Sequence, residues 1–302
     1  MTSKRAGLML ALTASVISGF AVFTNAYGVK AFGDATVYTT AKNLVAAVVL
    51  GVLLLAVRPG HAGNLRPHGS AQWAGLAAVA VIGGSVPFIL FFKGLATTSA
   101  ANAAFIQKSL VIWVALLAVP LLRERMGGRH ALAIAALLSG LVLLGGPHGL
   151  RITSGVVMIF AATLMWAVET IIAKRLLASL SPLTVGTARM GAGVAILIGY
   201  TLATTRWSAL TTIGWHQWSW AIATGMILAA YVAAWLAALA RTGAIDVTAL
   251  LVPAALITAL LQTGVQGKAL APQWPGLAVL AAGAAAMTLA VLRDRAAPAE
   301  AR

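Results

Sequence analysis

Residues 99–125 read SAANAAFIQKSLVIWVALLAVPLLRER, an apolar stretch that is long enough to cross a bilayer and ends in a cluster of positive charge. Gln107 and Lys108 lie within this stretch. A lysine in the hydrocarbon costs roughly 2.5–3.5 kcal/mol on insertion scales, so it normally faces a cavity or a partner. The stretch is therefore predicted to form one wall of a transport pathway.

The composition indicates a polytopic membrane protein. Of 302 residues, 61% are apolar and only 9% are charged, and the mean hydropathy is +0.94. A soluble domain carries about a quarter of its residues charged, so this chain cannot cover a surface that faces water. The net charge of +15 would suggest nucleic acid in a soluble protein. Here it is better explained by basic cytoplasmic loops, and no nucleic-acid partner is expected.

Ten segments are long and apolar enough to be transmembrane helices, and the connections between them are too short for a soluble domain. The expected fold class is therefore an all-α integral membrane protein of ten transmembrane helices. The predicted spans are 7–27, 37–57, 72–92, 99–121, 130–146, 154–173, 183–203, 217–237, 245–265 and 275–292.

The basic residues predict the orientation of the chain. When the ten spans are threaded back and forth, thirteen basic residues fall on the side of the N-terminus and five on the other. By the positive-inside rule, both termini are expected in the cytoplasm. Residues 293–302 are charged and contain a proline, and we expect them to form a disordered cytoplasmic tail.

A weak internal repeat relates the two halves of the chain. An offset of 144 residues places 23–30 on 167–174 and 99–103 on 243–247. Each half holds five spans, so the second half must be inserted upside down relative to the first. Inverted repeats of this kind are typical of alternating-access transporters, which bind substrate near the midplane between the repeats.

The repeat also aligns charged positions. With three residues inserted, Lys42 in the second span meets Arg189 in the seventh. The predicted boundaries are 1–148 for the first half and 149–292 for the second half.

Motifs at the ends of the fourth span of each half resemble those of EamA-type exporters in the drug/metabolite transporter superfamily. Residues 94–103, GLATTSAANA, match the small-residue start of that span, and 121–125, LLRER, match its end. In the second half, 238–247 fit the start, but the closing acid is missing, because 265–268 read VQGK.

This resemblance implies two five-helix EamA-like repeats and a secondary transporter of the bacterial inner membrane. The family often has a basic residue where Lys42 and Arg189 stand, early in the second helix of each half. The resemblance does not imply a particular substrate.

Lys108, Gln107 and Asn102 are candidate substrate-binding residues. At 1.5 Å per residue, Lys108 lies about 13 Å deep, close to the midplane. It is predicted to anchor an anionic or carboxylate-bearing substrate. The alternative is a structural lysine that bonds backbone carbonyls. Asn102 shares the general face of Lys108, but it is also a candidate helix cap.

Tyr231 is the fourth candidate for substrate binding, since it lies four residues from Trp235 on one helix face. The two rings could line a cavity and stack on a planar substrate. They could equally be packing residues, and Trp235 is interpreted as an interfacial anchor.

Glu169 and Arg189 reach similar depths from the cytoplasmic side and are predicted to pair within the membrane. The pair could hold two helices together, or it could act as a gate or proton site. The repeat puts neutral Asn25 opposite Lys42 at the outer end, so these four residues are the candidates for coupling or gating. Asp246, at the start of the ninth span, is interpreted as a helix cap.

Pro87 and Pro253 lie within the third and ninth spans and are candidate hinges, because a proline in a membrane helix often marks a bend around a cavity. Small residues such as Gly140 and the segment 281–286 indicate close helix packing, within one chain or in a homodimer.

Several chemistries are not supported by the sequence. There is no cysteine, no histidine pair with metal-ligand spacing and no GxxxxGK[ST] phosphate loop. No cofactor, metal or enzyme activity is predicted.

The predicted function is secondary transport, as an exporter of amino acids, other carboxylates or drugs by alternating access, with proton coupling as a hypothesis motivated by Glu169. The alternatives are an uncoupled facilitator, a non-transporting membrane scaffold and an intramembrane lipid enzyme.

Overall fold

The computed structural model describes residues 3–57, 65–98, 100–145, 151–204, 206–267 and 274–293, and none of these forms a strand. Within these ranges, nine helical spans are long and apolar enough to cross a membrane, and Gly128–Leu144 is a shorter apolar helix. The predicted all-α fold of ten transmembrane helices is confirmed.

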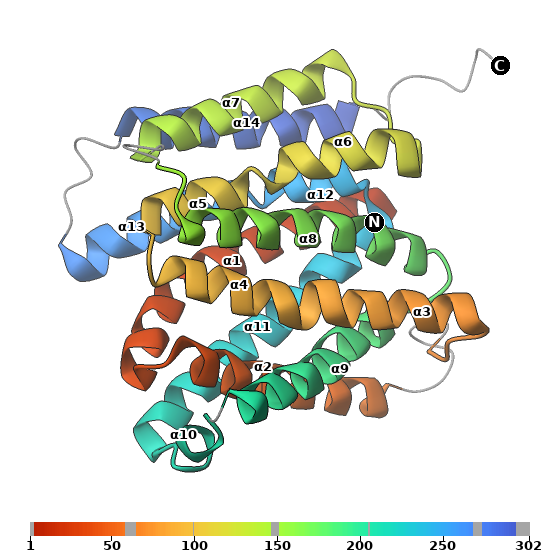
Figure 1. The fold of residues 1–302 in the computed structure, drawn as a ribbon. Coiled ribbons are helices and arrows are strands. Elements are labelled where there is room, and N and C mark those ends of the chain that lie inside the picture. The colour runs from red at the N-terminus through yellow and green to blue at the C-terminus, as the bar shows by residue number, and fades with distance from the viewer. Residues whose placement is uncertain are drawn as a thin grey trace.

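The two halves of the chain contain the same series of spans (Figure 1). The first half comprises α1 (Ser3–Phe32), α2 (Ala35–Ala56), α3 (Ser70–Val79), the π-helical segment η1 (Ala80–Ser85), α4 (Val86–Leu95), α5 (Ala100–Lys108), α6 (Leu110–Leu122) and α7 (Gly128–Gly145). The second comprises α8 (Ser154–Leu176), α9 (Pro182–Ala203), the short α10 (Trp207–Thr211), α11 (Trp215–Arg241), α12 (Ala244–Leu250), α13 (Ala254–Gln266) and α14 (Trp274–Arg293).

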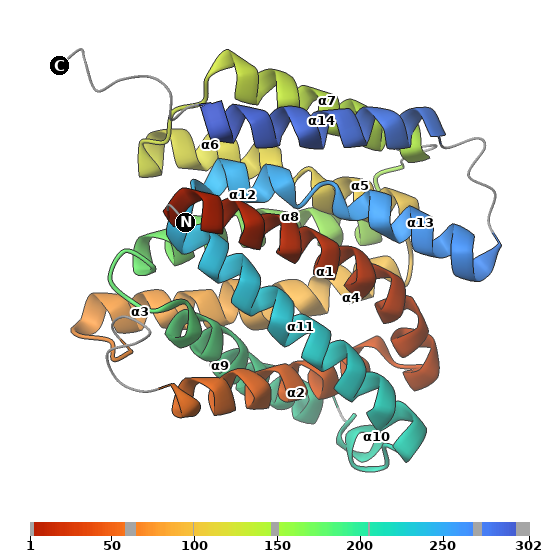
Figure 2. The same ribbon diagram turned by 180° about the vertical axis from the view of Figure 1, so that it is seen from behind.

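Contacts between the halves follow the inverted repeat. Three pairs of equivalent spans pack on each other: α7 on α14, α6 on α12 and α2 on α9. The remaining major contacts occur in matched sets, since α1 packs on α11 as α8 packs on the α3–α4 span, and α1 packs on α13 as α8 packs on α6. Both views show α7 and α14 at one edge of the molecule and α2 with α9 at the other (Figures 1 and 2). This symmetry confirms the inverted-repeat prediction.

The fourth and ninth spans are each broken in the middle. α5 gives way to α6 at Ser109, and α12 gives way to α13 at residues 251–253. The repeat offset of 144 places Ser109 on Pro253, so the two breaks are equivalent. The spans predicted at 99–121 and 245–265 correspond to the candidate membrane spans Asn102–Leu122 and Ala244–Val265, and the break at Ser109 was not predicted.

Different chemistry produces the two breaks. Pro253 has no backbone N–H, and its ring clashes with the preceding turn. At the other break, the Ser109 hydroxyl donates to the Ile106 carbonyl at 2.6 Å and accepts from the Trp113 indole at 3.2 Å. A serine that bonds its own backbone competes with the helical hydrogen bonds.

The third span crosses α9 where Gly84 meets Gly193. Gly83 and Gly84 lie in η1, directly before Pro87 at the start of α4. A Cβ atom on Gly84 would overlap the carbonyl oxygen of Arg189, and one on Gly193 would lie 2.8 Å from the Gly84 carbonyl. Pro87 and Pro253 thus both lie at helix interruptions, and their role as hinges stays a prediction.

Small residues bring α7 and α14 together within the chain. A Cβ on Gly140 would lie 2.6 Å from the backbone nitrogen of Leu280, and one on Gly283 would lie 2.9 Å from that of Leu137. The homodimer stays a prediction, and it would have to use other surfaces than this contact.

Two further predictions fall mostly outside the described residues. The boundary between the halves at 148 and 149 is one. The other is the tail at 293–302, of which only Arg293 is described, as the last residue of α14.

The crossing of η1 and α9 makes Gly84→Ala destabilising, because the new Cβ overlaps backbone that cannot move independently. We expect the free energy of unfolding to fall by about 1–3 kcal/mol, measured as a lower thermal midpoint in detergent. The control is Gly199→Ala in α9, where a Cβ would meet nothing within 4 Å. That variant should be as stable as the wild type or more stable. Equal midpoints for both variants would contradict the close crossing.

Candidate functional site

A buried ion pair joins α8 and α9. The carboxylate of Glu169 is 1% exposed and the guanidinium-bearing Arg189 is 4% exposed. Arg189 Nε donates to one carboxylate oxygen, and Nη2 donates to the other at 3.2 Å. Such a bidentate arrangement is the strongest geometry for an arginine and a carboxylate. The structure therefore forms the pair expected from the depths of the two residues, while its role in gating or coupling stays a prediction.

The third span leaves the space that the Glu169 carboxylate occupies. A Cβ on Gly83 would overlap the carboxyl group of Glu169, so only glycine leaves room for it. Pro87 lacks the N–H that would otherwise bond the Gly83 carbonyl four residues earlier. The indole of Trp166 on α8 donates to that carbonyl instead, at 3.3 Å. The interruption in the third span therefore has its freed carbonyl satisfied by the helix that carries Glu169.

Aromatic rings cover the arginine. The guanidinium carbon of Arg189 lies 5.6 Å from the ring centroids of both Phe88 and Trp235. Trp235 is only 6% exposed and stacks on Tyr231 with ring centroids 6.4 Å apart. The interpretation of Trp235 as an interfacial anchor was therefore wrong. Tyr231 is half-buried beside it, and its contact with substrate stays a prediction.

A second buried cation lies on α2. Lys42 is 2% exposed, and its Nζ donates to Asn25 Oδ1 over a long 3.4 Å. The same oxygen accepts a hydrogen bond from the Tyr38 hydroxyl at 2.5 Å. Three ring centroids, those of Tyr38, Phe88 and Phe92, lie 5.1, 5.5 and 4.7 Å from the ammonium. No carboxylate in the described part of the chain forms an ion pair with Lys42.

These two sites are repeat equivalents. Lys42 follows the first residue of α2 by seven positions, and Arg189 follows the first residue of α9 by seven. The offset of 144 places Asn25 on Glu169. Each cation thus binds the equivalent acceptor of its own half, but only one acceptor is charged. Phe88 contacts both cations and links the two sites.

Lys108 lies at the broken spans. Its Nζ donates to the carbonyl oxygen of Leu251 at 3.3 Å, and Leu251 lies at the break between α12 and α13. A helix break leaves carbonyls without their usual donors. This contact is the one expected if Lys108 is a structural lysine that bonds backbone carbonyls. The role of Lys108 in substrate binding stays a prediction. Gln107 and Asn102 are half-buried on α5, and their substrate roles are likewise predictions.

A contact at the opposite end of the fourth span was not anticipated from the sequence. The Glu124 carboxylate accepts from the backbone N–H groups of Ala244 at 2.7 Å and Ile245 at 3.1 Å, and so caps α12. Asp246 instead lies 3.3 Å from His130 Nε2. The assignment of the cap to Asp246 was therefore wrong. The signal for Glu124 was its place at the acidic position of the LLRER motif.

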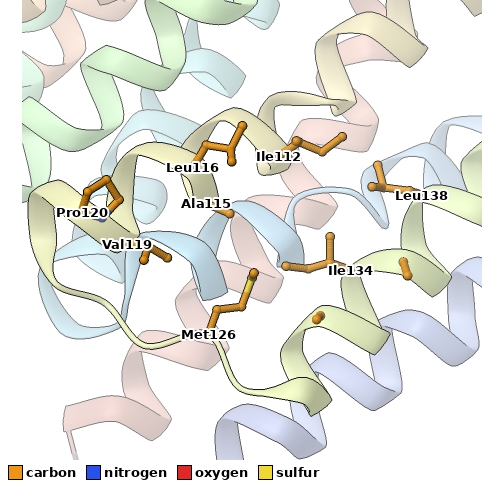
Figure 3. A pocket seen from close by; sticks show the side chains of 10 residues that line it. Ile112, Ala115, Leu116, Val119, Pro120, Met126, Ile134 and Leu138 are labelled. Atoms are coloured by element: carbon orange, nitrogen blue, oxygen red, sulfur yellow. The ribbon is translucent and has the colours of Figure 1, made fainter.

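The pocket in Figure 3 lies within the first half of the chain, between α6 and α7, and has a volume of about 480 Å³. It is not the cavity between the halves that a transport pathway requires. Its lining is apolar: Ile112, Ala115, Leu116, Val119, Pro120, Met126, Ala131, Ile134, Ala135 and Leu138.

The model of the EamA-like transporter family matches the chain twice, at residues 5–146 and 153–290. The chain belongs to the EamA-like transporter family. It is 26% identical over 215 residues to a Bacillus subtilis (strain 168) protein described as the uncharacterized transporter YyaM, a match that covers 67% of this chain and 69% of that protein. A solved crystal structure of a protein superposes with a TM-score of 0.76 at 17% identity, covering 94% of this chain and 98% of the other.

These findings confirm the family resemblance seen in the sequence. They show a multi-pass membrane transporter with the EamA architecture, and the solved structure shows the fold alone.

The unequal acceptors predict unequal responses to loss of the cation. Arg189→Met leaves the Glu169 carboxylate buried and unpaired, which costs about 3–5 kcal/mol of stability. Lys42→Met removes a buried cation without leaving any charge unpaired, so the thermal midpoint should stay the same or rise.

Thermal unfolding of both purified variants tests this difference. The control is the double variant Glu169→Gln/Arg189→Met, which should recover most of the stability lost in Arg189→Met. An equal decrease of the thermal midpoint in Arg189→Met and Lys42→Met would contradict the predicted difference in charge balance between the two sites.

Proposed function

We propose that this EamA-family chain is a secondary transporter of the bacterial cytoplasmic membrane that exports small carboxylate-bearing metabolites, such as amino acids, by alternating access. Both termini lie in the cytoplasm in this proposal. The observation that carries the substrate class is the charge balance inside the spans. Lys42, Lys108 and Arg189 are basic, and Glu169 is the one carboxylate that lies well inside a described span. An anionic group on the substrate would offset this excess of positive charge.

The broken spans support a pathway between the halves. Discontinuous helices near the midplane, at equivalent positions of inverted repeats, are the elements from which transporters build binding sites. Here the breaks occur at Ser109 and Pro253, and Lys108 connects one span to the other. In alternating access, one half rocks against the other and opens the space between them to each side in turn.

Transport in proteoliposomes tests the proposal. Liposomes with purified protein are preloaded with an unlabelled amino acid or monocarboxylate, and counterflow of the labelled form is measured. Saturable counterflow is expected for at least one carboxylate and not for its amide, with protein-free liposomes as the control. A complete panel without counterflow would contradict transport and favour a membrane scaffold.

Proton coupling through Glu169 is the second part of the proposal, and the bidentate pair with Arg189 gives it a structural basis. A proton on Glu169 would remove the ionic attraction and let α8 and α9 separate. We expect Glu169→Gln to abolish transport driven by a pH gradient while counterflow continues. The double variant Glu169→Gln/Arg189→Gln controls for the unpaired arginine. Unchanged pH-driven transport in both variants would rule out coupling through Glu169 and leave an uncoupled facilitator.

A further inference from the structure

Lys42 is a cation for which the described chain supplies no negative charge. Its side chain is 2% exposed, and its hydrogen-bond acceptor is the neutral carboxamide of Asn25 at 3.4 Å. That oxygen already accepts a much shorter bond from Tyr38. Aromatic rings stabilise an ammonium through their negative faces, which favours keeping Lys42 protonated. They do not neutralise it.

The second half of the same chain shows what such a position accommodates. At the equivalent place, Arg189 is neutralised by the carboxylate of Glu169 in a bidentate contact. Asn25 stands at the position of Glu169 in the first half. This fold can therefore accommodate a carboxylate next to a cation at this depth. At Lys42 the described chain does not provide that carboxylate.

The other two basic residues of the spans are already engaged. Arg189 is occupied by Glu169, and the Lys108 ammonium donates to a backbone carbonyl at the break of the ninth span. The same Leu251 carbonyl also accepts from the Ala254 N–H at 3.3 Å. Lys42 likewise shares its acceptor, because the Asn25 oxygen also accepts from Tyr38, and the ammonium of Lys42 lies 4.7–5.5 Å from three aromatic ring centroids.

The aromatic rings around Lys42 indicate which kind of substrate group would lie next to the bound carboxylate. Tyr38, Phe88 and Phe92 form one buried cluster, with Phe91 and Trp166 packed against it. Phe88 and Trp166 meet edge to face with centroids 5.6 Å apart. An aromatic or apolar group that accompanies an anion at Lys42 would meet the faces and edges of these rings.

We propose that Lys42 is the residue that binds the carboxylate of the substrate, and that its aromatic surroundings select acids that carry an aromatic or apolar group. This deepens the transport function proposed above and rests on it. Lys42 follows the start of α2 by seven residues, about 10 Å along the helix, so the carboxylate meets it in the outer half of the span. The substrate carboxylate pairs with the Lys42 ammonium in the same way as the Glu169 carboxylate pairs with the Arg189 guanidinium.

Binding of phenylacetate and its uncharged isostere phenylacetamide to purified protein, measured by titration calorimetry, tests this directly. Wild type should bind phenylacetate about 10-fold or more tightly than phenylacetamide, as one hydrogen bond to a charged group implies. Lys42→Met should abolish the difference between the two probes. Lys93→Met, at an exposed lysine in the last turn of α4, is the matched control and should keep the difference, and Lys108→Met is measured beside it as the rival site.

Asn25→Asp provides a second, independent variant. It places a carboxylate within the protein at the position of Glu169, where it pairs with Lys42. We expect the preference for phenylacetate to disappear and the thermal midpoint to rise, so loss of binding in a well-folded protein is visible. A structural role for Lys42 alone would raise the midpoint in this variant without changing the preference for the acid.

Three outcomes overturn the inference. The first is a preference for phenylacetate that survives in either Lys42→Met or Asn25→Asp, and the second is a preference that disappears in Lys108→Met instead. The third is wild type that binds neither probe or both equally, which rejects the substrate class.

The counterflow panel separates failure of this inference from failure of the transport function. Counterflow of a carboxylate that is unaffected by Lys42→Met rejects Lys42 and keeps transport. Phenylacetate binding that depends on Lys42, without counterflow of any solute, keeps the site and rejects transport.

Discussion

The pairing of Glu169 with Arg189 is the constraint to which much of the central structure conforms. A carboxylate and a guanidinium can be placed in the interior of a membrane protein only if each satisfies the other. The carboxylate requires space that only glycine leaves, and Gly83 provides it. The neighbouring Gly84 lets the third span approach α9 closely, and Trp166 bonds the carbonyl that Pro87 leaves free. The π-helical turn, the proline and the close crossing therefore all lie around one ion pair.

The inverted repeat gives this site a counterpart with different chemistry. Lys42 and Asn25 occupy the positions of Arg189 and Glu169, but the acceptor is neutral, and three aromatic rings surround the cation. The ends of the broken spans differ in the same way. Glu124 caps α12 at one end, whereas the repeat places Lys268, which lies outside the described residues, at the equivalent position of the sequence. Two halves with one fold thus present unequal charge to the two sides of the membrane.

Much of this could be predicted from the sequence, because depth in a membrane follows from counting residues along a helix. That arithmetic brought Glu169 and Arg189 together, and the repeat then placed Asn25 opposite Lys42. The contacts of Lys108 with Leu251 and of Glu124 with α12 could not be predicted, since each joins residues more than a hundred positions apart through backbone atoms that carry no sequence signal.

One misinterpretation and one feature that was not predicted have physical explanations. Trp235 looked like an interfacial anchor because tryptophan is common at membrane surfaces, but a cation above its ring makes a buried position equally favourable. The break at Ser109 was missed because its neighbours form helices readily, and the break depends on a hydroxyl bonded to its own backbone. Pro253 made the equivalent break visible in the second half.

The most direct measurement is an experimental structure of the wild-type protein with a transported carboxylate bound. We expect a carboxylate oxygen within hydrogen-bonding distance of Lys42 Nζ, about 2.7–2.9 Å, among the rings of Tyr38, Phe88 and Phe92, with Glu169 still bonded to Arg189. A carboxylate bound at Lys108 or elsewhere, with Lys42 still bonded to Asn25 alone, would contradict it.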